Sequence, residues 1–402
     1  MHGLTGALAV AAGYGSSLAM KRDGTVWGWG DNLYGQLGNG RPIGSVTPVR
    51  VSDLSGVQAL SASNSYVLAL KTDGTVWGWG ANRFAQLGDG TTTTRARPVQ
   101  VAGLGGVVAT RAGDDFSLAV KSDGNVWAWG LDIHNGPSLS FLTSPVQVTD
   151  LSGVAAVSAG LRHALALKTD GTVWAWGNND SGQAGDGTTT FHPTPVRVDG
   201  LTEVTAISAG RYFGLALKKD GTVWAWGENG NGQLGDGTTT VRTRPVQVQG
   251  LTSVVAISAG DLSSLALKSD GTVWAWGENG NGQLGDGTTT QRTTPVRVTG
   301  LTGIIALPGD GVSLAEKSDG TFWSWGGKVP GGGLEDYRTT PEQVTVIPRT
   351  RTVAFAAKYT VVMKTDGTVW TWGFGEEGQL GDGTLAFALT PGPAVLTAYT
   401  DG

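Results

Sequence analysis

Few side chains in this sequence could carry out chemistry, and their spacing is unfavourable for a catalytic or metal site. The chain has no Cys, which excludes a thiolate nucleophile, a thiolate zinc site and a disulfide scaffold. The four His lie far apart and lack the H-x-H or H-E-x-x-H spacing of a zinc site. They are His2, His134, His163 and His192. We therefore expect no metal, no cofactor and no catalytic residue.

Two weaker chemical interpretations remain. His163 could act with Asp114 or Asp115 in a Ser-His-Asp arrangement if the fold brings their loops together, although nothing positions a nucleophile beside them. The segment from Glu228 to Gly237 is rich in Asn, Asp and Gly, as calcium loops are. Calcium, however, takes about six to eight oxygens and usually several carboxylates. This segment offers no acidic cluster, so structural turns are the better interpretation.

The elements that position these side chains follow from the tryptophans. All 16 Trp fall in W-x-W pairs that recur every 47 to 50 residues. The pairs are Trp27/Trp29, Trp77/Trp79, Trp127/Trp129, Trp174/Trp176, Trp224/Trp226, Trp274/Trp276, Trp323/Trp325 and Trp370/Trp372. A repeat of this length indicates one array of similar units. We expect residues 1–402 to form a single domain of eight repeats, at about 1–53, 54–103, 104–150, 151–200, 201–250, 251–300, 301–347 and 348–402.

Each repeat contains four short runs typical of β-strands. In the copy that starts at Leu251, we name them strand A (Val254 to Ala259), strand B (Ser264 to Lys268), strand C (Thr272 to Gly277) and strand D (Pro295 to Val298). Asp270-Gly271 between strands B and C predicts a hairpin with a type I′ turn. Four-stranded units repeated at this spacing are typical of propeller blades. The W-x-W pairs, with a small residue between the two rings, should pack each blade against its neighbour.

The repeat also resembles a known family. The copies share the pattern A-x-S-A-G-x-x-x-S-L-A-L-K-x-D-G-x-V-W-x-W-G-x-N-x-x-G-Q-L-G-D-G-T, followed by P-V-x-V, which is similar to the repeat of the regulator of chromosome condensation propellers. The resemblance implies an all-β propeller with strand A innermost. Members of that family usually have seven blades, whereas this chain has eight copies. We expect eight four-stranded blades, with seven as the alternative.

The copies differ most in three residues between strands A and B, and differ little in the Asp-Gly turns between strands B and C. The A–B and C–D loops share one end of an up-and-down sheet, so the variable triplets should ring one mouth of the central channel. A bacterial β-lactamase inhibitor with this fold uses aromatic residues of its A–B loops to hold its target, and the resemblance implies a similar use here. The expected contact residues are Tyr14, Tyr66, Asp114, Asp115, Phe116, Arg162, His163, Arg211, Tyr212, Phe213, Asp261, Lys358 and Tyr359.

Other functions of the family fit less well. No copy is long enough to provide the wedge used for nucleotide exchange on a small GTPase, and the net charge of −5 disfavours chromatin and other nucleic acid. No run of about 18 apolar residues predicts insertion into a membrane. We expect a monomeric, non-enzymatic scaffold that binds a protein partner. The alternatives are a glycan-binding lectin or adhesin and a hydrolase at the channel mouth. The near-perfect copies without Cys suggest a secreted or surface protein of a bacterium, with a cytoplasmic protein as the alternative.

Overall fold

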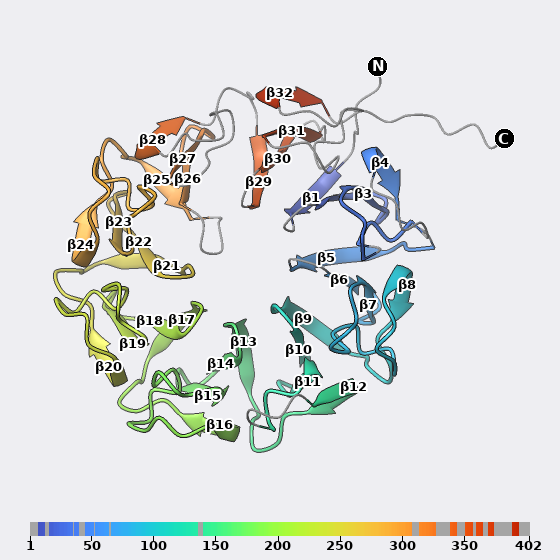
Figure 1. Ribbon diagram of the computed structural model, residues 1–402, viewed down its shortest axis with the longest axis horizontal. Helices are drawn as coiled ribbons and strands as arrows, with labels where there is room; N and C mark the ends of the chain where they lie inside the picture. The colour runs from blue at the N-terminus through green and yellow to red at the C-terminus, as the bar shows by residue number, and fades with distance from the viewer. Residues whose placement is uncertain are drawn as a thin grey trace.

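The computed structural model shows an all-β ring of four-stranded sheets (Figure 1). It describes residues 7–12, 16–34, 36–39, 45–51, 53–63, 66–135, 140–307, 313–326, 338–343, 350–356, 359–364, 369–373 and 388–393. In each sheet the strands pair antiparallel in chain order, as the sequence predicts. The description of β4 and of the strands from β29 to β32 is limited to the backbone.

The strands of the first four sheets have the following bounds. The first sheet contains β1 (Ala7–Ala12), β2 (Ser16–Lys21), β3 (Val26–Gly30) and β4 (Ser45–Arg50). The second contains β5 (Val57–Ala62), β6 (Tyr66–Lys71), β7 (Val76–Gly80) and β8 (Arg95–Gln100). The third contains β9 (Val107–Ala112), β10 (Phe116–Lys121), β11 (Val126–Leu131) and β12 (Phe141–Gln147). The fourth contains β13 (Val154–Ala159), β14 (His163–Lys168), β15 (Val173–Gly177) and β16 (His192–Arg197).

The remaining sheets repeat this arrangement. The fifth contains β17 (Val204–Ala209), β18 (Phe213–Lys218), β19 (Val223–Gly227) and β20 (Arg242–Gln247). The sixth contains β21 (Val254–Ala259), β22 (Ser263–Lys268), β23 (Val273–Gly277) and β24 (Arg292–Arg297). The seventh contains β25 (Ile304–Ala306), β26 (Leu314–Lys317), β27 (Phe322–Gly326) and β28 (Arg338–Gln343). The last contains β29 (Thr350–Ala356), β30 (Tyr359–Lys364), β31 (Val369–Gly373) and β32 (Ala388–Pro393).

Strand A of each blade lies closest to the ring axis. In Figure 1 the ends of β9, β13, β17 and β21 point toward the open centre, and β13 contacts β17, which contacts β21. Neighbouring inner strands are also tied by side chains, because Ser158 Oγ accepts a hydrogen bond from Ala209 N at 3.0 Å. Ser208 Oγ accepts from Ala259 N in the same way at 3.0 Å. The inner wall of the ring is therefore a continuous scaffold for the loops above it.

The Asp-Gly turns between strands B and C form hairpins, but they are not type I′. In the sixth blade Gly271 N donates to Lys268 O at 2.9 Å, and Lys268 N donates to Thr272 O at 2.9 Å. Gly271 has a φ of 75°, whereas Asp270 does not have a positive φ. This is the three-residue loop with a glycine bulge, a common alternative to the two-residue hairpin. Asp270 instead accepts hydrogen bonds from the backbone and hydroxyl of Thr272, which fixes the turn.

The two tryptophans of a pair face the preceding blade but differ in burial. Trp276 is fully buried and Trp274 is partly buried in the cluster between the fifth and sixth blades. Val273 and Ala275 point the other way, into the cluster between the sixth and seventh blades. The buried ring also donates a hydrogen bond from Nε1 to Gln233 O of the preceding blade at 2.8 Å. The pair therefore combines apolar packing with a polar tie between blades.

This difference in burial recurs around the ring and refines the prediction that the W-x-W pairs pack each blade against its neighbour. The second ring is at most 3% exposed wherever its side chain is described, in Trp29, Trp79, Trp129, Trp176, Trp226, Trp276 and Trp325. The first ring is only half-buried, in Trp27, Trp77, Trp127, Trp174, Trp224, Trp274 and Trp323. The second tryptophan is therefore the main packing group between blades.

The polar tie of the second ring is present at most of these interfaces. Trp79 donates from Nε1 to Gln36 O at 2.7 Å, and Trp325 donates to Gln283 O at 2.9 Å. Trp29 is buried with no hydrogen-bond partner for Nε1 among the described residues. Trp370 and Trp372 lie in β31, where the structure describes the backbone, so the packing role of these two side chains stays a prediction.

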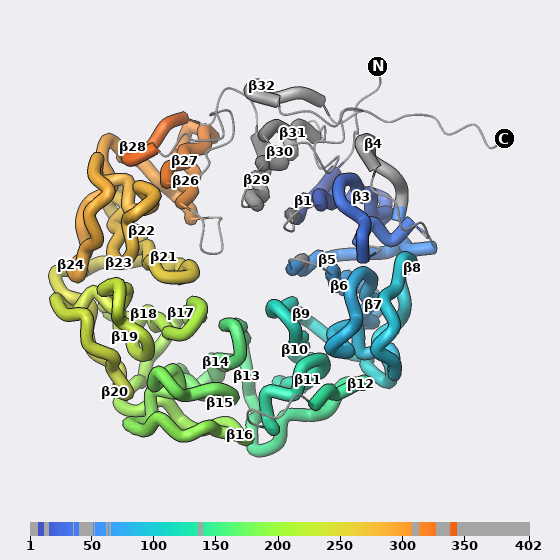
Figure 2. Tube along the Cα trace, viewed as in Figure 1, coloured from blue at the N-terminus to red at the C-terminus, as the bar shows by residue number. Residues whose placement is uncertain are grey.

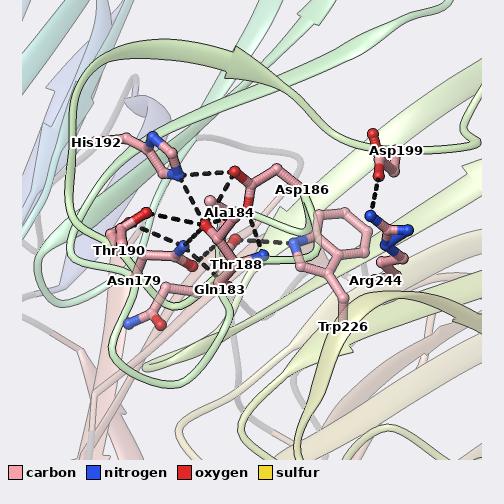
Figure 3. Close-up of polar contacts among 10 residues, drawn as sticks. All are labelled: Asn179, Gln183, Ala184, Asp186, Thr188, Thr190, His192, Asp199, Trp226 and Arg244. Atoms are coloured by element: carbon pink, nitrogen blue, oxygen red, sulfur yellow. Dashed lines mark hydrogen bonds and ion pairs between the residues drawn. The ribbon is translucent and has the colours of Figure 1, made fainter.

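The segment between strands C and D of one blade docks on strand D of the next. Between the fourth and fifth blades, Gly187 N donates to Thr243 O at 2.8 Å. Asp199 pairs with Arg244 at 3.3 Å beside this contact, as Figure 3 shows. The Gly-to-Thr hydrogen bond recurs at Gly90/Thr143, Gly237/Thr293 and Gly287/Thr339. These bonds hold consecutive blades together at the outer side of the ring.

The number of blades corrects the sequence prediction of eight equivalent units. In the part of the chain with described side chains, six hydrophobic clusters join seven blades in order, from β1–β4 to β25–β28. Figure 2 follows the chain through them. The eighth copy forms a further four-stranded sheet, described by its backbone pairing, between β28 and β1 in Figure 1. Its inner strand places Thr350 opposite Lys364, where the sixth blade has buried Val254 opposite Lys268. Among the sheets whose side chains are described, seven therefore form blades that share this packing, and the prediction of eight equivalent blades is corrected.

Candidate functional site

The A–B and C–D loops lie at the same end of each blade, as expected. The first residue after strand C bonds to the A–B loop of its own blade: Glu278 N donates to Leu262 O at 3.0 Å, and Asn178 N donates to Arg162 O at 2.9 Å. At the opposite end, the hairpin turn of one blade meets the linker to the next, where Ile304 N donates to Gly271 O at 3.1 Å. We call the first end the loop face and the second the turn face.

Four of the predicted contact residues are buried, which corrects their assignment. Tyr66, Phe116, His163 and Phe213 are at most 1% exposed. Each is the first residue of strand B, in β6, β10, β14 and β18, and the side chain points between blades. In these four blades the third position of the variable triplet therefore belongs to the core and cannot contact a partner at the surface.

These buried rings form polar and apolar ties between blades. Tyr66 donates its hydroxyl to Phe116 O at 2.8 Å and lies 2.9 Å from Ser117 Oγ. Burial, which outweighs the hydrogen bond to Ser117, raises the pKa of Tyr66 above its ordinary range. Tyr66 is thus a neutral structural group that links the second blade to the third.

His163 is buried and neutral. Neither of its two ring nitrogens has a hydrogen-bond partner among the described residues. Burial, opposed only weakly by the nearby backbone of Phe213, lowers the pKa of His163 from 6.5 to about 4. A general base needs access to the proton that it removes, which this side chain lacks. The structure therefore gives no support to the Ser-His-Asp arrangement.

The exposed members of the triplets converge from several blades. Arg162, Arg211 and Asp261 are exposed, and Tyr212 is half-buried with the Arg211 guanidinium 5.5 Å from its ring centroid. Leu161 N donates to Arg211 O at 3.2 Å, so the loops of the fourth and fifth blades are bonded to each other. These side chains form the accessible part of the predicted site.

Asp114 and Asp115 lie half-buried among these charges. Burial raises the pKa of Asp114, and the charges of Asp115 and Asp261 add to this while Arg211 opposes it. Burial also raises the pKa of Asp115, against the lowering effect of Arg83 and Arg162. Charges from the second to the sixth blade therefore act on one Asp-Asp dipeptide of the loop face.

Three predicted contacts cannot be placed as side chains. Tyr14 and Lys358 lie outside the described residues. Tyr359 begins β30, which is described by its backbone.

Sequence reasoning missed a second group of residues on the loop face. The Arg83 guanidinium stacks 4.3 Å from the ring centroid of Phe84, and the Phe84 and Phe141 rings lie 5.6 Å apart at 59°. Phe141 is 37% exposed and Arg83 is also exposed. The aligned C–D segments of the fifth and sixth blades have Gly-Asn where the second has Arg83-Phe84. This difference between the copies was the sequence signal that could have identified Arg83 and Phe84.

The Asn-rich C–D segments use their own oxygens internally. In the fifth blade Asp236 pairs with Arg242 at 2.6 Å and accepts a hydrogen bond from Thr238 N at 3.0 Å. Figure 3 shows the fourth-blade version, in which His192 lies 2.8 Å from Asp186. Among the described residues there is no group of three His, Asp or Glu that could hold a metal ion. No helix long and apolar enough to cross a membrane occurs in the described part.

The accessible chemistry of the loop face is thus guanidinium groups, carboxylates and partly exposed aromatic rings. An aromatic ring beside acidic residues, as in Asp114-Asp115-Phe116, would be needed for glycan binding at this loop, but Phe116 is buried and cannot stack on a sugar. The arrangement can form ion pairs and apolar contacts with another molecule. It holds no accessible nucleophile and base pair among the predicted residues.

Solved structures of other proteins share this fold. Yeast RCC1 (Prp20) bound to Kap60 is 24% identical with a TM-score of 0.60, over 92% of this chain and 83% of that one. Prp20p from Saccharomyces cerevisiae, studied with its binding to Gsp1p and histones, is 22% identical with a TM-score of 0.60, over 95% and 88%. Human WBSCR16 is 21% identical with a TM-score of 0.65, over 80% and 94%. Identities at this level show the fold alone.

Sequence profiles identify the family. Two profiles of the regulator of chromosome condensation (RCC1) repeat match the first part of the chain, at residues 23–70 and 73–120 and at residues 8–36, 57–86 and 107–135. No curated protein matches the chain in sequence. The profile of the RCC1-like domain matches residues 138–397, more than half of the 402 residues. The chain therefore belongs to the RCC1-like domain family, as its repeat pattern implied.

Proposed function

We propose that this propeller is a non-enzymatic scaffold that binds a protein partner through its loop face. The observation that supports this most is the difference between the two ends of the ring. The turn face repeats the same Asp-Gly hairpins, whereas the loop face places exposed Arg162, Arg211 and Asp261 around half-buried Tyr212. Arginine and tyrosine are enriched among the residues that dominate binding energy at protein interfaces.

The similar solved proteins support the same class of function. Yeast RCC1 (Prp20) is bound to Kap60, and Prp20p was studied for binding to Gsp1p and histones. Rigid scaffolds with variable loops at one end commonly use those loops for recognition. These partners are not transferred to the present chain, because a partner is selected by the loop residues.

A triple variant tests the proposal. Arg162→Ala, Arg211→Ala and Tyr212→Ala together remove exposed side chains without touching buried Phe213. The matched control is Arg197→Ala with Arg297→Ala, which removes two exposed arginines from the outer strands β16 and β24. Proteins captured from the native source by the unmodified chain should be lost with the triple variant and kept with the control. Capture of the same proteins by all three would overturn the proposal, provided that all three melt at the same temperature.

A further inference from the structure

Three arginines of the loop face differ from most arginines of the outer strands in having no ion pair. On the outer strands Arg95, Arg242 and Arg292 pair with Asp89, Asp236 and Asp286 at 2.6 Å. On the loop face Arg83, Arg162 and Arg211 are exposed, and no carboxylate of the described residues lies within 4.0 Å of their guanidinium nitrogens. Their charge is thus available to a second molecule.

Arg83 is held in place by an aromatic surface. Its guanidinium stacks on Phe84, and stacking leaves the N–H edge of the guanidinium free to bind a carboxylate. Phe84 itself is fixed, because its ring packs against the cluster that contains Leu131 and its backbone N donates to Gln86 Oε1 at 2.9 Å. Binding through a preorganised arginine loses less conformational entropy than binding through a mobile one.

Apolar surface lies beside this charge. Phe141 is 37% exposed and tilts against Phe84, so the pair presents ring surface to solvent at the start of β12. We call Arg83, Phe84, Asp115, Phe141 and Arg162 the Arg83 patch. The Arg83 and Arg162 guanidinium groups both act on the half-buried carboxylate of Asp115, so this part of the loop face carries two arginines although the whole chain has a net charge of −5.

We propose that the Arg83 patch binds an extended segment of a protein partner that carries carboxylates next to an apolar or aromatic side chain. This inference rests on the proposed protein-binding function and specifies the chemistry of the partner. The carboxylates pair with Arg83 and Arg162, and the apolar side chain packs on Phe84 and Phe141. Buried apolar contacts supply affinity, and the charges supply orientation and specificity.

A protein segment fits this patch better than a long polyanion. Asp115, on which the charges of Arg83 and Arg162 act, and its neighbour Asp114 would repel a continuous run of phosphates or sulfates. A peptide can place a small number of carboxylates against Arg83 and Arg162 and place uncharged residues beside the aspartates. The aromatic pair Phe84/Phe141 adds a contact that a sulfated polysaccharide cannot use.

A random peptide library displayed on phage provides the test without knowledge of the native partner. The library is selected on the full chain, and enriched peptides are synthesised and titrated by fluorescence anisotropy. We expect the enriched sequences to combine Asp or Glu with Phe, Tyr, Trp or Leu. Affinity should fall about tenfold or more in the double variant Arg83→Ala/Arg162→Ala and about fivefold in Phe141→Ala, as for central interface residues. Arg197→Ala/Arg297→Ala, the charge-matched control, should bind as the unmodified chain does.

Several results would overturn the inference. They are the absence of enriched peptides, the enrichment of neutral or basic peptides, and unchanged affinity in Arg83→Ala/Arg162→Ala. If heparin or a single-stranded oligonucleotide displaced the peptides and bound the chain as tightly as they do, the patch would be assigned to polyanions instead. Peptides that need Arg211 and Tyr212 but not Arg83 would overturn this inference and leave the proposed function intact. The capture experiment tests that function, because its triple variant also changes Arg211 and Tyr212, which lie outside the Arg83 patch.

Discussion

The imidazole of His163 lies directly over Gly160, such that a Cβ on this glycine would come within 2.1 Å of His163 Cε1. The same relationship holds one blade further on, where a Cβ on Gly210 would come within 2.1 Å of Phe213 Cε1. The residue that follows strand A in these two blades must therefore be glycine, because the first side chain of strand B occupies the space that a Cβ would fill. This pairing also explains why the third triplet residue is part of the core.

The glycine contact predicts a marked difference between two alanine substitutions. Gly210→Ala forces a methyl group into the buried ring of Phe213 and should destabilise the protein by about 1–3 kcal/mol, as overpacking does. Gly105→Ala is the matched control, because a Cβ there meets nothing within 4 Å and the φ is not positive. Urea unfolding measures both. Equal free energies of unfolding for the two variants would contradict the contact.

His163 predicts a pH dependence of stability. Its pKa is about 4 in the folded protein, below the ordinary 6.5, so the unfolded chain binds more protons between these values. Its neutral form therefore favours folding fully above about pH 6.5, and this contribution is lost as the pH falls toward 4. The loss amounts to about 3 kcal/mol.

The variant His163→Phe isolates that effect, since Phe already occupies the equivalent position as Phe116 and Phe213. Urea unfolding at neutral pH and near pH 4.5 should show a smaller loss of stability in the variant than in the unmodified chain. Parallel losses in the two proteins would show that His163 does not titrate on unfolding.

The tryptophans of one pair should differ in their contribution. Trp226 is fully buried and donates to Gln183 O at 2.8 Å, whereas Trp224 is half-buried under Lys218. Trp226→Ala should cost about 3–5 kcal/mol, and Trp224→Ala clearly less. Thermal melting of the two variants gives the order. A larger loss from Trp224→Ala would contradict the assigned packing.

The fourth blade offers a separate test of the tryptophan hydrogen bond. Trp176 Nε1 is buried and has no hydrogen-bond partner in the described part of the chain, while Trp129, Trp226 and Trp276 donate to a Gln carbonyl of the preceding blade. The third copy lacks that Gln, because its segment after Leu131 has a different sequence. Replacing Trp226 by Phe leaves a buried carbonyl unpaired, and replacing Trp176 does not. Trp226→Phe should therefore be more destabilising than Trp176→Phe by about 1 kcal/mol, measured by urea unfolding. Equal losses would show that the bond adds nothing.

Much of the fold was predictable from the sequence because the same strand and turn pattern recurs in every copy and can be compared between copies. The strand pattern of the copy at Leu251 agrees with β21 to β24, although strand D begins earlier, at Arg292. The W-x-W pairs indicated the interfaces between blades, but the spacing alone could not show that the second ring is the more buried of the two. The predicted number of equivalent blades was wrong because the number of W-x-W copies does not show which copies share the side-chain packing that joins seven blades among the described residues.

The site was predictable only in part. Loop variation pointed to Arg162, Arg211, Tyr212 and Asp261, but it could not show that Tyr66 turns inward. The pairing of strands A and B decides which triplet residue faces the neighbouring blade. The sequence of a single repeat does not show how it is aligned with the next blade, so this orientation could not be predicted. Arg83 and Phe84 were missed because the C–D segments were compared for lost motifs rather than for added aromatic residues. The expectation of a secreted or surface protein of a bacterium stays a prediction.

The central claim is that the loop face binds a protein partner. The most direct measurement is the affinity of a captured partner for three proteins: the unmodified chain, Arg162→Ala/Arg211→Ala/Tyr212→Ala, and Arg197→Ala/Arg297→Ala. Our account predicts at least about a hundredfold loss for the loop-face variant, since two or more central residues cost about 1.4 kcal/mol each, and no change for the outer-strand control. Equal affinity for all three proteins, or a loss confined to the outer-strand control, would contradict it.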